Sequence, residues 1–342
     1  MCRIMDIKET NLLRVYENKP RGTKSQSFKE NNTSDYKDPL KQWPIRGFAY
    51  SNELGAAIHG ISPTLGTALW IPALMYIGAD VYDKYKNDNT SYNPSTKRGT
   101  KEAIFQGLAS VILPTAAVGI GQKTASSLNR LTDGGLSTQA KIDVLERSLD
   151  FVQSNDLNSF DSNSQDYSAK FTKSILQKSD DAKNEFKNLN PIKKIISMLN
   201  PFKDSDNITH ASKSKLEDYS QKHADKVIRM YGQLMNDEKP EQLPQKLFDN
   251  FKKNQIDYAQ TSQGGNAKAE AIRTVLKDFH ERLILKNKLI KTAGGFIALG
   301  LMIKPIDSFV EHFIIKKTVE PGFDYISQYR QRNNFMQNRN IF

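Results

Sequence analysis

The residues best suited to chemistry lie together near the C-terminal end of the chain. Asp307 and Glu311 are four positions apart, so a helix would place them on one face. His312 follows them directly, and Lys304 lies one turn earlier. Two carboxylates and an imidazole could hold a divalent cation or pass a proton. A cation site usually needs three or more ligands that converge from different parts of a chain. We therefore expect Lys304 to pair with Asp307, and the other two residues to face lipid headgroups or water.

Other ionisable residues mark the ends of apolar segments. His59 stands at the start of the first apolar block, at a depth where water reaches it even if the block enters a membrane. Asp80 and Asp83 stand at the opposite end of that block. We expect them to fix the edge of the apolar segment, with Lys84 and Lys86 as their partners.

The remaining candidate sites have simpler structural interpretations. His223 falls on an apolar helical stripe, which is typical of a buried core histidine. Asp278 and His280 have a ligand-like spacing only by chance. Residues 119–124, GIGQKT, lack the first glycine of a phosphate loop and the strand that should precede it. We expect no catalytic residue, no cofactor-binding residue and no metal ligand, and an enzyme is the least supported class.

The charge and cysteine content narrow the class of partner. Lysine and arginine outnumber aspartate and glutamate by 49 to 38, which gives a net charge of +11 and favours polyanions such as anionic lipid headgroups or nucleic acid. Nucleic acid is the less favoured partner, because the basic residues lack interleaved aromatic residues in a recognised motif. The only cysteine is Cys2, which excludes an intrachain disulfide. The first thirty residues lack the apolar core of a cleavable signal.

The low apolar content is concentrated in blocks. Segments 58–79 and 103–121 contain no Asp, Glu, Lys or Arg, and each is close to the ~20 residues that cross a bilayer core. A polar loop joins them, so residues 45–125 predict an apolar helical hairpin inserted in a membrane. Prolines within the two segments are better tolerated in membrane helices than in soluble ones. Small residues allow close helix contact in the second segment: Gly107, Ala109, Ser110, Ala116, Ala117 and Gly119.

The rest of the chain is hydrophilic, with one exception. Residues 1–44 predict a disordered basic and polar tail. Residues 126–288 predict a hydrophilic helical region with linkers, bundle-like or loosely coiled, because apolar residues there recur at three and four positions. Residues 289–318 form a C-terminal apolar and amphipathic helix whose uncharged part, Thr292–Ile303, is too short to cross a bilayer alone. We expect this helix to pack against the hairpin or lie at the interface. Residues 319–342 form a polar tail.

The sequence thus predicts an all-α protein anchored in a membrane, with a structural or interaction role. One alternative is a soluble or peripheral helical protein that buries the hairpin in its centre, and another is a subunit of a small-solute or ion transporter. The expected partner is the bilayer with anionic headgroups, and a homo-oligomer is compatible with the pattern. The sequence identifies no protein partner. Basic residues around the loop suggest a cytoplasmic loop by the positive-inside rule: Lys84, Lys86, Lys97, Arg98 and Lys101.

Overall fold

The computed structural model describes residues 38–42, 44–87, 93–131, 135–154, 164–193, 208–261 and 267–339. Every regular element in these ranges is a helix, which confirms the predicted all-α class. Within residues 1–44, predicted to be a disordered tail, the described part contains the short helix η1 (Pro39–Lys41), capped by the Asp38 carboxylate at the Leu40 amide. Residues 1–37 and 43 lie outside the described ranges.

The first apolar segment folds back on the helices that precede it. A tight turn follows α2, with the Ser62 amide bonded to the Ile58 carbonyl, and a Cβ atom on Gly55 would lie 2.5 Å from the Gly66 carbonyl oxygen. The chain therefore rises through α1 and α2 and returns antiparallel through α3 and α4. Pro63 occupies the first turn of α3, where a missing N–H costs little. The bounds are α1 (Ile45–Phe48), α2 (Ser51–Ile58), α3 (Pro63–Ala68) and α4 (Trp70–Lys86).

The second apolar segment is one continuous helix in three parts, α5 (Thr96–Phe105), η2 (Gln106–Ile112) and α6 (Leu113–Leu128). The middle part, η2, is a π-helix, and Pro114 follows it in the first turn of α6 without ending the helix. The α5 part packs on α4, as expected for a hairpin. The α6 part packs mainly on α13 (Ala267–Phe309), as expected for a C-terminal apolar helix that packs against the hairpin.

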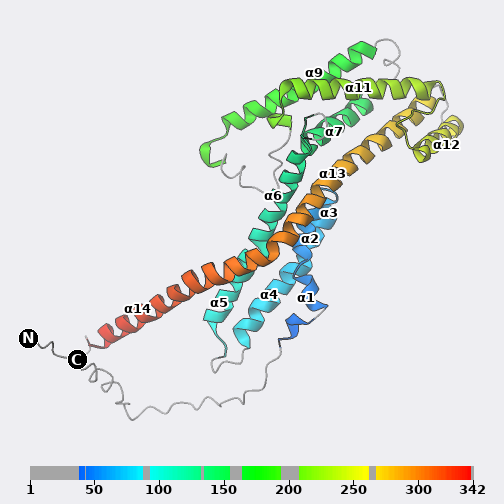
Figure 1. The fold of residues 1–342 in the computed structure, drawn as a ribbon. Helices are drawn as coiled ribbons and strands as arrows, with labels where there is room; N and C mark the ends of the chain where they lie inside the picture. The colour runs from blue at the N-terminus through cyan, green and yellow to red at the C-terminus, as the bar shows by residue number, and fades with distance from the viewer. Residues whose placement is uncertain are drawn as a thin grey trace, which may run out of the picture.

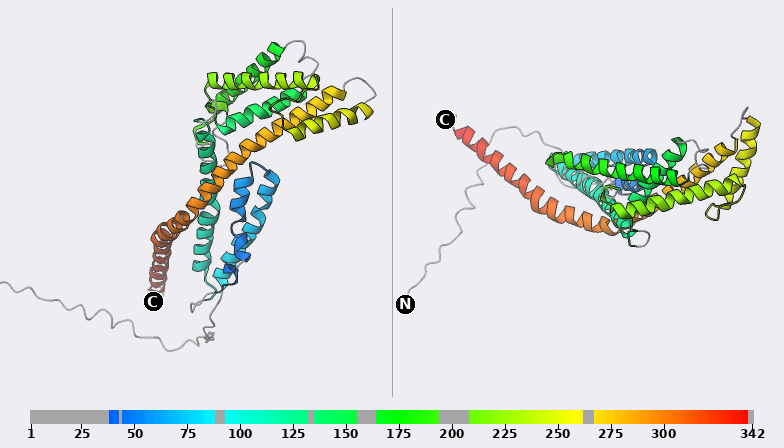
Figure 2. Two further views of the ribbon diagram at one scale, coloured as in Figure 1. Left: turned by 45° about the vertical axis from the view of Figure 1, so that its right-hand side comes forward. Right: turned by 90° about the horizontal axis from the view of Figure 1, so that it is seen from above.

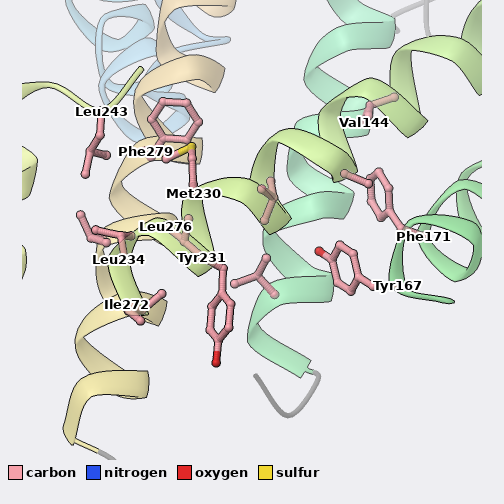
Figure 3. Packing of buried hydrophobic residues seen from close by; sticks show 14 of the residues in the cluster. Val144, Tyr167, Phe171, Met230, Tyr231, Leu234, Leu243, Ile272, Leu276 and Phe279 are labelled. Atoms are coloured by element: carbon pink, nitrogen blue, oxygen red, sulfur yellow. The ribbon is translucent and has the colours of Figure 1, made fainter. Parts of the chain in front are cut away.

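The hydrophilic region forms a helical layer, which we call the head. It comprises α7 (Thr138–Ser154), α9 (Ser164–Asn188), η3 (Ile208–His210), α11 (Lys213–Met235), α12 (Gln245–Thr261) and the first part of α13. Of the linker predicted at residues 154–165, positions 155–163 lie outside the described ranges. Figure 3 shows α11 carrying Met230 and Leu234 toward Leu276 of α13, with Tyr167 and Phe171 of α9 on its other side. The predicted α11 stripe is therefore a buried face of the bundle.

One long helix joins the head to the apolar segments. It runs without interruption through α13 (Ala267–Phe309), η4 (Val310–Val319) and α14 (Glu320–Arg339). The boundaries expected at 288/289 and 318/319 both fall inside this helix, and Pro305 lies within it. Figures 1 and 2 show it running the length of the molecule, with α9 and α11 at one end and the C-terminus of α14 at the other. The end of α4 and the start of α5 lie at that second end.

A contact between glycines fixes the crossing of α6 and α13. A Cβ atom on Gly121 would lie 2.4 Å from both the Gly294 carbonyl oxygen and the Ala298 Cβ. A Cβ atom on Gly294 would lie 2.3 Å from the Ala125 Cβ. Each helix thus contributes a glycine and an alanine four positions apart, a spacing that lets two backbones approach closely.

The three apolar helices are long and apolar enough to cross a membrane, by length and composition. They are Pro63–Lys86, Thr96–Leu128 and Ala267–Asn333, and only 17%, 39% and 22% of their most apolar windows are buried within the chain. The third of these was expected to be too short. It reaches spanning length because the helix continues through Pro305 into η4.

Candidate functional site

We call the part of the molecule formed by the three apolar helices and the α1 and α2 helices that precede them the apolar layer. Polar side chains converge inside it, at the contact of α2, α4, α5 and η2. We call this set the polar network, and it consists of Asn52, Asp80, Glu102, Gln106 and Ser110. Glu102, Gln106 and Ser110 are spaced four apart, so the helix presents them on one face. Asn52 is fully buried, Asp80 is 6% exposed and Gln106 is 7% exposed.

Gln106 is the centre of the polar network. Its Nε2 donates to Asp80 Oδ2 at 2.6 Å and to Glu102 Oε1 at 2.9 Å. Its Oε1 accepts from the Ser110 hydroxyl at 2.6 Å. Asn52 Nδ2 donates to the Ser110 carbonyl and extends the network to α2. The Gln106 amide therefore cross-links α4 to the helix formed by α5 and η2.

The two carboxylates give the polar network its chemistry. Asp80 and Glu102 accept from the same amide nitrogen, so each lies in the field of the other. Two neighbouring anions away from water repel each other, and a shared proton removes one of the charges. Gln106 lies at the first position of the π-helix, an irregularity that is frequent at functional sites.

The group singled out near the C-terminus does not converge. The Glu311 carboxylate lies 3.7 Å from the Lys316 ammonium, and His312 Nδ1 lies 2.9 Å from the carbonyl oxygen of its own helix at Ser308. Asp307 is exposed on α13 and interacts electrostatically with Glu53 of α2. Within the described ranges, no three His, Cys, Asp or Glu side chains are grouped closely enough to hold a metal ion.

One ion pair expected at the ends of the first apolar block is present, between Lys84 and Asp83, and the other residues there have different partners. Lys84 binds Asp38 of the preceding segment at 2.5 Å and lies 4.0 Å from Asp83. Asp80 belongs to the polar network, and the Lys86 ammonium lies 5.7 Å from the ring centre of Tyr82. His59 ends α2 at the turn into α3, half-buried.

The structure brings together two histidines that the sequence placed on separate helices. His223 of α11 and His280 of α13 lie with their Nε2 atoms 3.1 Å apart, and both rings are buried. Burial and the neighbouring His280 and Lys226 hold the pKa of His223 well below its ordinary value. Asp278 does not take part in this contact. Residues 119–124 are helical, within α6.

Sequence analysis missed the polar network because its members come from three separate segments. One local signal was present: Glu102, Gln106 and Ser110 form a polar stripe at intervals of four at the start of an apolar block. Likewise, His280 lies four positions after Leu276, on the apolar stripe of its helix. Comparison of the chain with family models, with curated proteins and with solved structures gives no match.

Proposed function

We propose that this chain is a membrane-anchored helical protein with a structural or interaction role. In this proposal the three apolar helices cross the bilayer and the head stands on one side of it. The observation that carries the proposal is the exposure of large apolar side chains along all three helices. They include Ile71 at 61%, Met75 at 70%, Ile112 at 57%, Ile120 at 64%, Ile297 at 64% and Leu301 at 70%.

Such exposure is costly in water. Soluble monomers rarely expose contiguous apolar patches larger than a few hundred Å². In hydrocarbon the same side chains meet a solvent as apolar as themselves, and helices associate through small residues instead. The Gly121–Gly294 crossing has this character.

The lengths of the apolar stretches also support insertion. Residues 60–79 and 103–122 contain no charged side chain. At 1.5 Å per residue, about 20 residues span about 30 Å, the thickness of a bilayer core. The long helix has a shorter uncharged stretch, Thr292–Ile303, and reaches spanning length by continuing past Lys304 and Asp307. The Lys304 side chain is long enough to extend its ammonium toward water.

Ion pairs mark the end of the apolar layer that lies away from the head. Lys97 binds Asp324 at 2.8 Å, and Lys101 binds Glu320 at 2.6 Å, which joins α5 to α14. Anionic headgroups would be the natural neighbours of the surrounding basic residues. By the positive-inside rule this end, with the C-terminus, would face the cytoplasm and the head would face the opposite side.

The alternative of a soluble protein with a buried central hairpin requires the chain to enclose its own apolar segments. In the first two helices 17% and 39% of the residues in the most apolar windows are buried, so this chain alone does not fully enclose them. A soluble form would need further copies or partners to cover it.

Extraction and labelling test the proposal. After membrane preparation, the protein should remain in the pellet through alkaline carbonate and high salt and should dissolve in detergent. Release by carbonate would overturn the proposal. Single cysteines at the exposed positions Thr96, Ser214 and Ser327, in a Cys2→Ser background, then define the topology. A membrane-impermeant maleimide should label Thr96→Cys and Ser327→Cys from one side and Ser214→Cys from the other.

A transporter subunit is the second candidate, and the buried Asp80 beside the half-buried Glu102 is the observation that favours it. Ionisable residues within membrane segments frequently serve ion pathways. Proteoliposomes with a pH-sensitive dye inside would test proton passage under an imposed pH gradient. Loss of flux in Asp80→Asn but not in Asp307→Asn would support this function. Flux at the level of empty liposomes in the unmodified protein would remove it.

A further inference from the structure

The buried histidine pair lies where three helices of the head meet. Ser148 comes from α7, His223 from α11 and His280 from α13. The Ser148 hydroxyl lies 2.9 Å from His280 Nε2 and 3.2 Å from His223 Nε2. The two imidazole rings meet edge to face, with their centres 5.1 Å apart. One hydroxyl and two imidazoles thus form a closed triangle of polar contacts within an apolar core.

The hydrogen bonds define the protonation state in which this triangle is complete. His280 Nδ1 lies 2.6 Å from the Leu276 carbonyl oxygen, which can only accept, so Nδ1 carries the hydrogen. In the neutral ring of His280, Nε2 is then an acceptor, and it accepts a hydrogen bond from the Ser148 hydroxyl. His223 Nε2–H in turn donates to the Ser148 oxygen. With both rings neutral, each of the two Ser148 contacts therefore joins one donor to one acceptor.

The surroundings disfavour a positive charge at this position. Aromatic rings lie beside the pair, with Phe171 of α9 and Tyr219 of α11 both 6.4 Å from the His223 ring centre. The Tyr167 hydroxyl of α9 lies near Ser148. Among the described residues, the charged groups that act on His223 are His280 and Lys226, and both oppose its protonation.

We propose that the His223–His280 contact is a pH-sensitive latch that holds α11 against α7 and α13. With both rings neutral, the Ser148 triangle closes and the three helices pack. A doubly protonated pair would set two N–H donors against each other at 3.1 Å, next to Lys226, and in the part of the chain that the structure describes no carboxylate acts on His223 to offset the charge. Proton uptake therefore favours separation of α11, which uncovers the apolar face that it buries: Leu216, Val227, Met230 and Leu234.

The direction of the pH effect follows from the pKa of His223 in the closed state. The pKa of His223 in the closed state lies below its ordinary value of 6.5, so the open state binds protons more readily. The latch is fully closed above that ordinary value and weakens as the pH falls below it.

Hydrogen exchange on the full-length protein in detergent micelles tests the latch. Protection of the α11 amides, corrected for intrinsic exchange, should fall at least about tenfold more than protection of α6 between about pH 7.5 and pH 5.5, because the open state binds protons more readily. Equal loss in α11 and α6, or no loss in α11, would overturn the proposal.

Two variants separate the latch from a general sensitivity to acid. His223→Gln should abolish the pH dependence of α11 protection, whether the variant is more or less stable than the parent. His210→Gln is the matched control, because His210 is an exposed histidine of the same head and should leave the dependence unchanged. A pH dependence that persists in His223→Gln would assign it to other groups. The test on the unmodified protein stands even if His223→Gln fails to fold.

Discussion

The head and the apolar layer bury opposite kinds of side chain. The largest fully buried residues, including Tyr231, Phe171 and Phe251, belong to the head. In the apolar layer the buried residues are mostly small, and many of the large apolar ones are exposed, although Leu299, Ile306 and Ile315 are buried. The buried alanines there are Ala56, Ala57, Ala73, Ala109 and Ala117.

This difference shows what stabilises each part. The head is stabilised by removing large apolar surface from water, the main favourable term in folding. The apolar layer gains little from that term within the chain, because many of its large side chains stay exposed. Close backbone contact and buried hydrogen bonds, as at Gly121 and Gln106, are what remain to hold it together. Substitutions should therefore act by different rules in the two parts.

The largest effect is expected where the two backbones of the apolar layer meet. Gly121→Leu would drive a side chain into the Gly294 carbonyl and the Ala298 methyl, each 2.4 Å from the new Cβ. Relief requires α6 and α13 to separate, at a cost of about 3 kcal/mol or more. The midpoint of thermal unfolding in detergent, followed by tryptophan fluorescence, measures this loss.

Gly300→Leu provides the matched control on α13. A Cβ atom at Gly300 meets no atom within 4 Å, so this variant should keep the unfolding midpoint of the parent. Equal losses in the two variants would mean that leucine is harmful anywhere on these helices. The crossing would then not be what holds the layer together.

The next effect compares one large apolar residue from each part. Phe171→Ala, in the head, should lower the free energy of unfolding by about 3–5 kcal/mol, because the fully buried ring leaves a cavity. Ile71→Ala, on α4, should change it by about 0.5 kcal/mol or less, since the side chain is 61% exposed. Thermal unfolding of the full chain in detergent measures both.

Ile71→Lys sharpens this comparison by testing the surroundings of α4. In water a lysine at an exposed position is nearly neutral. In hydrocarbon the substitution should cost about 2.5–3.5 kcal/mol at mid-depth and lower the membrane-inserted fraction. Normal insertion and yield of Ile71→Lys would indicate that α4 faces water or a polar partner.

The extent to which the sequence predicts this fold also differs between the two parts. Uncharged blocks predict the apolar helices, and apolar residues that recur every three or four positions predict the buried face of α11. Both predictions depend only on the spacing of residues that are close in the sequence. The length of the last apolar helix was underestimated, because its uncharged part, Thr292–Ile303, was interpreted as too short to cross a bilayer and residues 319–342 were interpreted as a polar tail. In the structure the helix passes through Pro305, whose missing N–H leaves only local backbone groups to be satisfied.

Contacts between distant segments could not be derived from one sequence. Gly121 and Gly294 are recognisable as small residues, but nothing local assigns them to each other. Asp80 meets Gln106 only because α4 and α5 pack in one particular register, with a π-helix starting at Gln106. His223 and His280 each follow from their own apolar stripe, whereas their contact depends on the angle at which α11 and α13 cross.

The smallest effect concerns the ion pair at the far end of the apolar layer. Lys97 and Asp324 are 2.8 Å apart with side chains 52% and 64% exposed. An exposed pair of this kind contributes about 1 kcal/mol or less. A double-mutant cycle with Lys97→Ala and Asp324→Ala in detergent should give a coupling of this size that disappears at about 1 M salt. A coupling above about 2 kcal/mol that survives high salt would mean that water does not reach the pair. The boundary of the apolar layer would then lie beyond Asp324 on α14, and the comparison between the two parts would have to be redrawn there.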